Sequence, residues 1–91
     1  MADPAAPRLR LDKFLWFARI VKTRSAAQLL AKQGRLRING RAVDRSHAPV
    51  GAGDVLSFAV NGKVRVLRIE ALPARRGAPA EARSLYSEIE G

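Results

Sequence analysis

The sequence predicts an α+β fold in which two N-terminal helices pack on a small antiparallel sheet with hairpins, and a short helix follows near the C-terminus. Three observations predict it. Apolar residues between Leu11 and Gln33 recur with the period of a helix, and the residues after Gly34 alternate between polar and apolar as in a strand. The dipeptide Asn-Gly occurs twice, and both of its residues tolerate the positive φ angles of tight hairpin turns.

The first helix is expected to run from Leu11 to about Val21. Asp12 lies in its first turn, where a negative charge suits the positive end of the helix dipole. Trp16 and Ile20 lie on nearly the opposite side from the residues that share the core-facing stripe, which are Leu11, Phe14, Leu15, Ala18 and Val21. This helix is therefore apolar on two faces and must be covered from both directions.

The second helix is expected to end at about Gln33, with Gly34 providing a left-handed stop. Either Thr23 or Ser25 can cap its N-terminus; Ser25 has capping-box spacing with Gln28, whereas Thr23 leaves the better helix length. Polar residues recur every four positions along one side of this helix, at Arg24, Gln28 and Lys32.

Two hairpins are expected after the helices, each turning at an Asn-Gly pair. The first joins residues 35–38 to residues 41–43 through Asn39-Gly40. The second joins residues 54–60 to residues 63–69 through Asn61-Gly62. Asp44 and Asp54 lie in or near turns, where we expect them to hold loops. Phe14 and Phe58 are expected in the core.

The ends of the chain differ in composition from its centre. Residues 1–8 are rich in Ala and Pro, which predicts a flexible tail. Residues 9–70 form the predicted domain, and residues 71–79, rich in Ala, Pro, Gly and Arg, are interpreted as a linker. Residues 80–91 are expected to form a C-terminal helical extension, with Pro79 starting a helix that reaches about Glu88.

The net charge of +9 is confined to one stretch. Between Arg8 and Arg45 there are eleven basic residues and two acidic ones, Asp12 and Asp44, whereas the basic and acidic residues elsewhere cancel. A charge segregated in this way creates a local field that attracts polyanions. Nucleic acid is therefore the leading class of partner, and a solvated basic face without a ligand is the alternative.

Other classes of function lack support in the sequence. There is no Cys for a disulfide or a thiolate, and the single His47 lies in a predicted loop. The carboxylates are scattered without catalytic or metal-binding spacing, so we expect no enzyme activity, metal, cofactor or small-molecule substrate. No apolar run is long enough for a membrane helix and the N-terminus lacks signal-peptide features, so we expect a cytoplasmic protein that does not contact membranes.

The basic side chains fall on elements that the fold can bring together. If the second helix packs beside the first hairpin, they line one continuous concave surface. The basic members from the helices and their turn are Arg10, Lys13, Lys22, Arg24 and Lys32, beside which lies the polar Gln28, and those from the hairpin are Arg35, Arg37 and Arg41. Each Lys or Arg that meets a phosphate releases counterions, so affinity should fall steeply with salt.

A set of short motifs along residues 9–60 resembles the S-four RNA-binding domain, named after small-subunit ribosomal protein four. The motifs are Arg10-Leu11-Asp12-Lys13, Leu15, Thr23-Arg24-Ser25-Ala26-Ala27, Gly34, Ile38-Asn39-Gly40 and Gly53-Asp54. The resemblance implies the alpha-L RNA-binding motif, two helices on an antiparallel sheet. The RNA contacts that it implies are Arg10, Lys13, Lys22, Arg24, Ser25, Gln28, Lys32, Arg35 and Asn39, to which the charge pattern adds Arg37 and Arg41.

Within that family, residues 11–19 and 22–24, together with Leu85-Tyr86, are similar to the fifteen-kilodalton, ribosome-associated heat-shock proteins of bacteria. The resemblance implies ribosomal RNA and the large ribosomal subunit as partners, with peptidyl-tRNA in stalled complexes and a role in the stress response. The present chain is shorter and lacks the longer basic C-terminal tail expected of such proteins. No feature demands a dimer, so we expect a monomer.

Two questions stay open at the level of sequence. We expect Leu85, Tyr86 and Ile89 to fold back over Trp16 and Ile20, the alternative being that Trp16 stacks on an unpaired base. Residues 10–33 also fit a DNA-binding helix-turn-helix. The strand pattern and hairpin that follow favour the RNA-binding fold.

Overall fold

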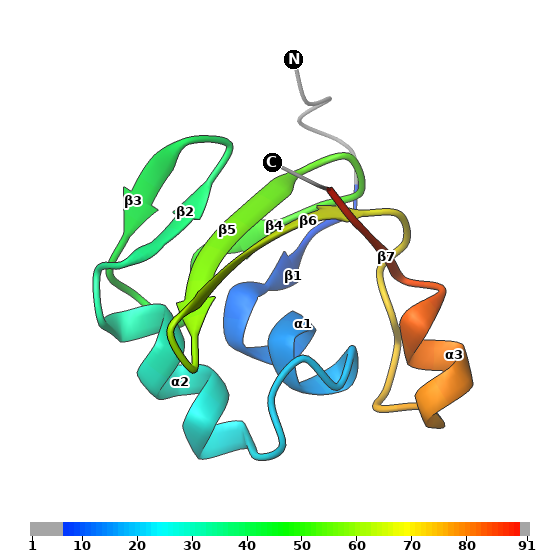
Figure 1. Cartoon of the computed structure of the whole chain (residues 1–91). Coiled ribbons are helices and arrows are strands. Elements are labelled where there is room, and N and C mark those ends of the chain that lie inside the picture. The colour runs from blue at the N-terminus through cyan, green and yellow to red at the C-terminus, as the bar shows by residue number, and fades with distance from the viewer. Residues whose placement is uncertain (1–6, 90–91) are drawn as a thin grey trace.

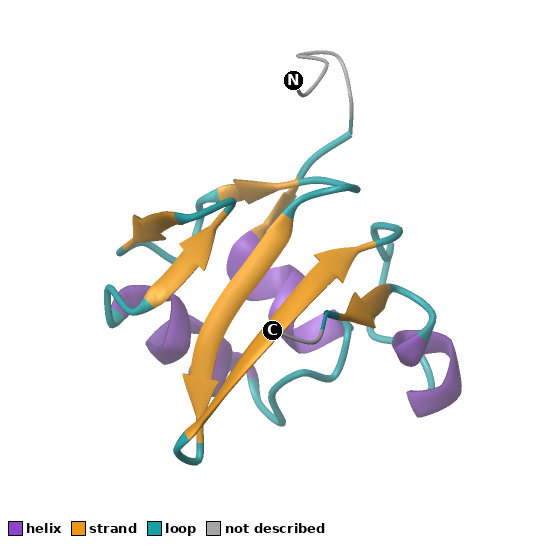
Figure 2. Ribbon diagram, turned by 45° about the horizontal axis from the view of Figure 1, so that its top comes forward, coloured by secondary structure: helices purple, strands orange, loops and turns teal. Residues whose placement is uncertain are grey.

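The α+β fold is confirmed, with two helices lying against one face of an antiparallel sheet (Figures 1 and 2). The computed structural model describes residues 7–89. Its sheet has the strand order β3-β2-β5-β6-β7, and a two-stranded ladder joins β1 to β4. The elements are β1 (Leu9–Arg10), α1 (Leu11–Phe17), α2 (Arg24–Lys32), β2 (Leu36–Ile38), β3 (Arg41–Val43), β4 (Pro49–Val50), β5 (Val55–Val60), β6 (Lys63–Ile69), α3 (Pro79–Arg83) and β7 (Tyr86–Glu88).

Helix α1 is shorter than the expected range of 11–21. It ends at Phe17, and Arg19 adopts a φ of 57°, a left-handed conformation that a helix cannot continue through. The backbone N–H groups of Ile20 and Val21 then both turn back to the carbonyl oxygen of Leu15. The apolar spacing up to Val21 therefore reflects packing of a turn against the core, because Ile20 and Val21 remain partly buried there.

Helix α2 begins at the first of its two candidate caps. The hydroxyl of Thr23 accepts a hydrogen bond of 3.0 Å from the backbone N–H of Ala26, which satisfies one of the helix's free donors. The helix then buries Ala27, Leu30 and Ala31. Gly34 has a φ of 74°, so the predicted left-handed stop is confirmed.

Both predicted Asn-Gly hairpins are confirmed. Asn39 and Asn61 each have a φ of 52°, and the glycines that follow them also have positive φ. The first turn connects β2 to β3, and the second connects β5 to β6 in a register that pairs Val60 with Lys63. These turns fix which side chains of each strand face the helices.

The core lies between the sheet and the two N-terminal helices. Phe14 and Leu15 of α1 are completely buried, and the inner face of the sheet contributes Leu36, Leu56, Phe58, Leu67 and Ile69. The predicted core positions of Phe14 and Phe58 are confirmed. Among residues 7–89, no helix lies on the opposite face of the sheet (Figure 2). Val64, on that face, is exposed.

The β1–β4 ladder was not predicted from the sequence. Leu9 pairs with Val50, and Arg10 pairs with Pro49. The loop before β4 is also hydrogen-bonded to α1, through the N–H of Leu11 to the carbonyl of Ala48 at 2.8 Å. Arg10, at the start of α1, is thereby held beside residues 46–50.

The predicted C-terminal helix is wrong beyond Arg83. Helix α3 ends there, and Tyr86–Glu88 forms the edge strand β7 paired with β6. The spacing of Leu85 and Ile89 suggested a longer helix, but β6 offers free backbone groups that a strand can pair with.

Arg65 of β6 also pairs with Glu88 of β7. Burial acts to lower the pKa of Arg65, but hydrogen bonds to Glu88 and Tyr86 outweigh it and raise that pKa.

Only some of the remaining predictions for the two ends of the chain can be compared with the structure. Residues 1–6 of the predicted tail and residues 90–91 lie outside the described residues. Residues 70–78 contain no helix or strand, and Pro79, the last residue of the predicted linker, begins α3. Leu85 and Tyr86 pack, partly buried, against the core that Trp16 and Ile20 also join, whereas Ile89 is not part of that cluster.

Candidate nucleic-acid interface

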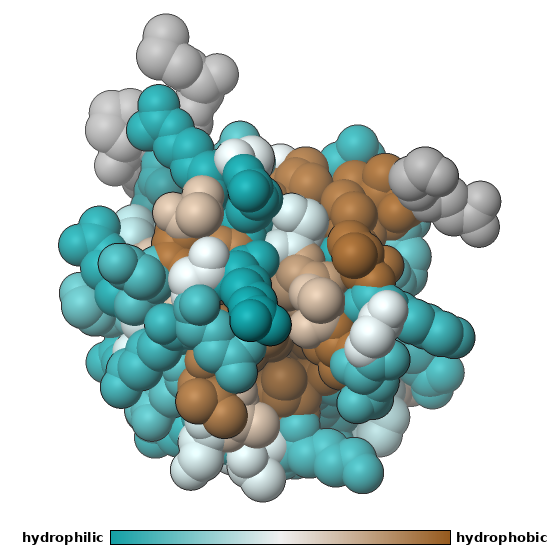
Figure 3. Space-filling model, turned by 60° about the vertical axis from the view of Figure 1, so that its left-hand side comes forward, coloured by the Kyte–Doolittle hydropathy of each residue, from teal (hydrophilic) through white to brown (hydrophobic). Residues whose placement is uncertain are grey.

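The predicted contacts on α2 and its preceding turn form an exposed polar face. Lys22, Arg24, Ser25 and Lys32 are exposed, and Gln28 is half-buried between them. Buried Ala27, Leu30 and Ala31 fix the opposite side of the helix against the core, so the four side chains on the helix point outward, and Lys22 is exposed in the turn before it. We call Lys22, Arg24, Ser25, Gln28 and Lys32 the helix face. Figure 3 views the molecule from the side where α2 and the β2–β3 hairpin lie, and hydrophilic side chains there surround a central hydrophobic area.

Arg10 is held in place by a buried carboxylate. Its Nε and Nη2 atoms donate hydrogen bonds of 3.1 and 2.9 Å to the two oxygens of Asp12. The Asp12 side chain is fully buried and also accepts from the backbone N–H of Lys13, whereas the Arg10 side chain is 45% exposed. The carboxylate that was expected to act on the helix dipole therefore also orients a predicted RNA contact. Lys13 itself is half-buried on the first turn of α1.

Arg35 and Arg37 do not join the single concave surface that was expected. Arg37 pairs with Ser57 in the sheet, and strand alternation directs both side chains away from the helices. Arg35 and Arg37 line a shallow cavity of about 200 Å³ on this outer face together with Ser57 and Val64. The basic groups are thus divided between two sides of the sheet.

Arg41 lies on the other side, in a cavity of about 450 Å³ between β3 and the β4 loop. Arg45 lines the same cavity, and so does Pro49, the pairing partner of Arg10. Arg45 was not among the predicted contacts. It belongs to the basic stretch, but the loop that carries it has no periodicity from which its direction could be read.

Asn39 has a structural role at the turn between β2 and β3. Its amide nitrogen donates a 3.0 Å hydrogen bond to Asp54, and its amide oxygen accepts a 2.9 Å hydrogen bond from the N–H of Val55. Asp54 also accepts from the N–H of Gly51 at 2.8 Å, as expected of a residue that holds a loop. The side chain therefore shapes the hairpin beside the basic groups, although it is itself exposed.

The positive charges of these residues are mostly without acidic partners. Within residues 7–89, Arg10 is the one member of the predicted set that forms an ion pair. Over the same residues, His, Asp and Glu side chains form no group of three able to hold a metal ion. None of the helices there has the length and apolar character that crossing a membrane requires. The basic side chains are thus largely exposed and, within residues 7–89, largely without acidic partners.

Comparison with known proteins agrees with this geometry. The family model of the S4 domain, the S-four domain of the resemblance above, matches residues 9–56. The heat shock protein 15 homolog of Haemophilus influenzae is 39% identical over 87 residues, which cover 94% of this chain. The RQC P-site tRNA stabilizing factor of Bacillus subtilis is 38% identical over 64 residues, covering 70% of this chain and 73% of that protein.

A solved structure, the trimeric heat shock protein 15 of Vibrio cholerae, superposes with a TM-score of 0.83 at 31% identity, covering 91% of this chain and 83% of that one. The chain spans 65% of the length of the Haemophilus influenzae relative. The matched segment holds α1, α2 and the β2–β3 hairpin, which carry the basic surface described above. The chain belongs to the S4 domain family and is similar to heat shock protein 15.

Proposed function

We propose that this chain is a non-catalytic protein that binds structured ribosomal RNA through the helix face and the neighbouring basic groups. One observation carries the proposal: Lys22, Arg24 and Lys32 are exposed on one face and form no ion pair within residues 7–89. Cations gathered without counter-charges repel one another, and a polyanion that docks on them removes that repulsion. The backbone N–H groups at the start of α2 favour an anion at the same place.

The surface is better suited to recognising RNA through its phosphates and overall shape than to reading base edges. Double-stranded RNA hides its base edges in a deep, narrow groove and is recognised mainly through phosphates, 2′-hydroxyls and overall shape. A helix face backed by a buried core is rigid enough for such recognition. The exposed side chains are charged or hydroxyl groups at fixed positions, which suits contacts to phosphates.

The relatives indicate which RNA to test. Several are named heat shock protein 15, and others are named for stabilising tRNA at the P site. We therefore propose the large ribosomal subunit as the partner, with peptidyl-tRNA in stalled complexes and during stress as the state engaged. We also propose a cytoplasmic location, as ribosome binding requires.

Co-sedimentation tests this proposal. The purified chain is mixed with separated large subunits, small subunits, intact ribosomes or duplex DNA at two salt concentrations. Selective, salt-sensitive retention on large subunits is the expected result, because phosphate contacts weaken as salt rises. Equal retention on every polyanion would contradict a specific ribosomal role.

A DNA-binding helix-turn-helix is the competing proposal, and the same experiment separates the two. In that mode the second helix enters the major groove. Here only three residues separate α2 from the β2–β3 hairpin, and the recognition helix of a simple helix-turn-helix is not followed by such a hairpin. Preferential retention on duplex DNA would favour this alternative and reject the RNA proposal.

A further inference from the structure

Two arginines from distant parts of the chain lie close to the indole ring of Trp16. The guanidinium carbon of Arg24, from the helix face, lies 6.0 Å from the centroid of the ring. The guanidinium carbon of Arg76 lies 5.4 Å from the same centroid. Both distances fall in the range of cation–π attraction, for which Trp is the best aromatic partner. Arg76 lies outside residues 9–56, the segment that the S4 family matches.

The segment that carries Arg76 is fixed to the end of α1. Arg76 donates from Nε to the carbonyl oxygen of Trp16 at 3.1 Å. Next to it, the carbonyl oxygen of Gly77 accepts a 2.7 Å hydrogen bond from Nε of Arg19. Gly77 is buried, and Arg76 is half-buried. Although the sequence suggests a linker, this part of it is tied to the helix layer by two side chains.

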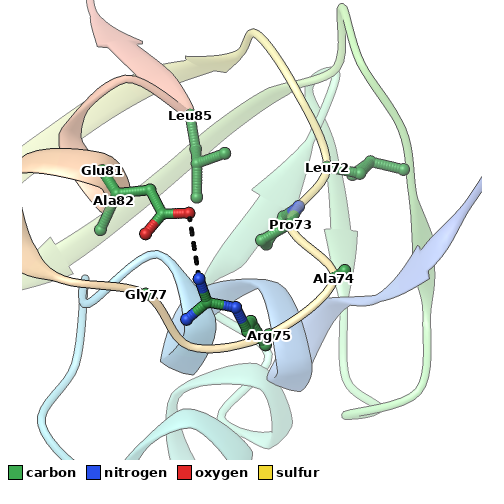
Figure 4. Close-up of a pocket in the computed structure, with 8 residues that line it drawn as sticks. All are labelled: Leu72, Pro73, Ala74, Arg75, Gly77, Glu81, Ala82 and Leu85. Carbon is green, nitrogen blue, oxygen red and sulfur yellow. Dashed lines mark ion pairs between the residues drawn. The ribbon is translucent and has the colours of Figure 1, made fainter.

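The opposite side of the segment lies against α3. Residues 72–75 and Gly77 border a cavity of about 230 Å³ together with residues of α3. Figure 4 shows the side chain of Arg75 directed towards Glu81 of α3. Their ion pair is 3.8 Å long, and both side chains are mostly exposed, so it contributes little to stability. Arg75 thus leans towards α3 while Arg76 lies over Trp16.

The positive charges around Trp16 favour the binding of an anion. Within the described residues, neither Arg24 nor Arg76 forms an ion pair with a carboxylate. Two like charges on one ring repel each other, and the ring attracts each of them only modestly. Arg19 and exposed Lys22 add further positive charge from the end of α1 and the turn that follows. An anionic group near Arg24 and Arg76 would relieve this repulsion.

We propose that Arg24 and Arg76 together form a subsite for an RNA backbone phosphate, and that Trp16 is a positioning residue that holds both guanidinium groups there. The inference rests on the proposed function and extends it past the S4 segment into residues 70–78. Phosphate of RNA is the expected ligand because Arg24 also belongs to the helix face, so one RNA backbone can run along both. Stacking of Trp16 on a base is disfavoured, since two arginines already occupy its surroundings.

Binding of the full chain to purified large ribosomal subunits across a series of salt concentrations tests the subsite. Arg76→Ala is expected to weaken binding several-fold and to lower the salt slope by about one, the mark of one lost phosphate contact. Arg68→Ala is the matched control, because Arg68 is an exposed arginine on the outer face of the sheet. It should leave both quantities near those of the unchanged chain.

Two further variants test the positioning role of Trp16. Trp16→Phe keeps an aromatic face for the arginines and should retain most of the salt slope. Trp16→Leu keeps an apolar side chain but removes the ring, so it should lower the slope as Arg76→Ala does. Trp16 is the chain's one Trp, so its fluorescence should also change when subunits are added, and change less in Arg76→Ala.

The outcomes separate this inference from the function on which it rests. If the unchanged chain fails to bind, the proposed function itself is rejected. If the unchanged chain binds, Arg24→Ala weakens it and Arg76→Ala matches Arg68→Ala, the subsite alone is rejected. Weaker binding of Arg76→Ala with an unchanged salt slope would also overturn the subsite, because it would assign Arg76 a purely structural role.

Discussion

Asn39 and Asp54, fifteen residues apart, are joined by a 3.0 Å hydrogen bond from the Asn39 amide to the Asp54 carboxylate. The same amide accepts from the N–H of Val55, and the same carboxylate accepts from the N–H of Gly51. These bonds tie the β2–β3 turn to the turn that precedes β5. A residue that the sequence places among the RNA contacts therefore fixes the hairpin that carries Arg37 and Arg41.

These hydrogen bonds of Asn39 predict that substitutions in the two Asn-Gly turns lower the free energy of unfolding by different amounts. Asn39→Gly keeps the positive φ but loses both side-chain hydrogen bonds, so it should lower the free energy of unfolding by about 1–2 kcal/mol. Asn61→Gly is the matched control: Asn61 has the same φ of 52°, and no side-chain hydrogen bond joins it to the described residues. Its change should stay within about 0.5 kcal/mol. Urea denaturation measures both, and equal losses would refute the structural role of Asn39.

Arg10→Ala should destabilise the fold as well as weaken RNA binding. Without Arg10, the fully buried Asp12 carboxylate keeps only the hydrogen bond from the N–H of Lys13. An undercompensated buried charge of this kind should cost about 1–3 kcal/mol of unfolding free energy. Lys22→Ala removes an exposed charge instead and should cost no more than about 0.5 kcal/mol. Equal stability of the two variants by urea denaturation would show that the Arg10–Asp12 pair does not hold the start of α1.

Substitutions of two leucines, one in the core and one on the surface, should differ in their effect on the free energy of unfolding. Leu15 is completely buried, so Leu15→Ala should lower the free energy of unfolding by about 2–5 kcal/mol. Leu29 on α2 is 61% exposed, so Leu29→Ala should change it by no more than about 0.5 kcal/mol. Thermal and urea unfolding of both variants provide the measurement. A small cost at Leu15 would mean that α1 does not form the centre of the core.

Arg24→Ala and Lys32→Ala should each weaken RNA binding and lower the salt slope by about one. Both side chains are exposed, so neither change should alter the unfolding free energy by more than about 0.5 kcal/mol. Filter binding to large-subunit ribosomal RNA, repeated at several salt concentrations, measures the effect. A slope unchanged in both variants would place the RNA on a different surface.

Much of the fold follows from local chemistry that can be read in the sequence. The Asn39-Gly40 and Asn61-Gly62 turns need only residues that accept positive φ, and the stop after α2 needs only Gly34. The core positions of Phe14 and Phe58 follow from periodicity. These features depend on residues a few positions apart, so no tertiary contact is needed to predict them.

Features that depend on distant pairing could not be predicted in this way. Strands of two residues, such as β1 and β4, have no measurable alternation, and only their ladder with each other defines them. The β7 strand forms because β6 offers a free edge, which overrides the helical spacing of Leu85 and Ile89. The position of Arg37 on the outer face of the sheet, away from the helix face, likewise depends on the register of β2 with β5. Arg76 gave no signal in the sequence, because its contact with Trp16 spans sixty positions.

Binding of ribosomal RNA by the helix face is tested most directly by co-sedimentation of the Arg24→Ala, Lys32→Ala double variant with large ribosomal subunits, beside the unchanged chain and Arg68→Ala. We predict that the unchanged chain and Arg68→Ala are retained at low salt, while the folded double variant stays in the supernatant. Retention of the double variant equal to that of the unchanged chain would contradict the claim that the helix face binds ribosomal RNA.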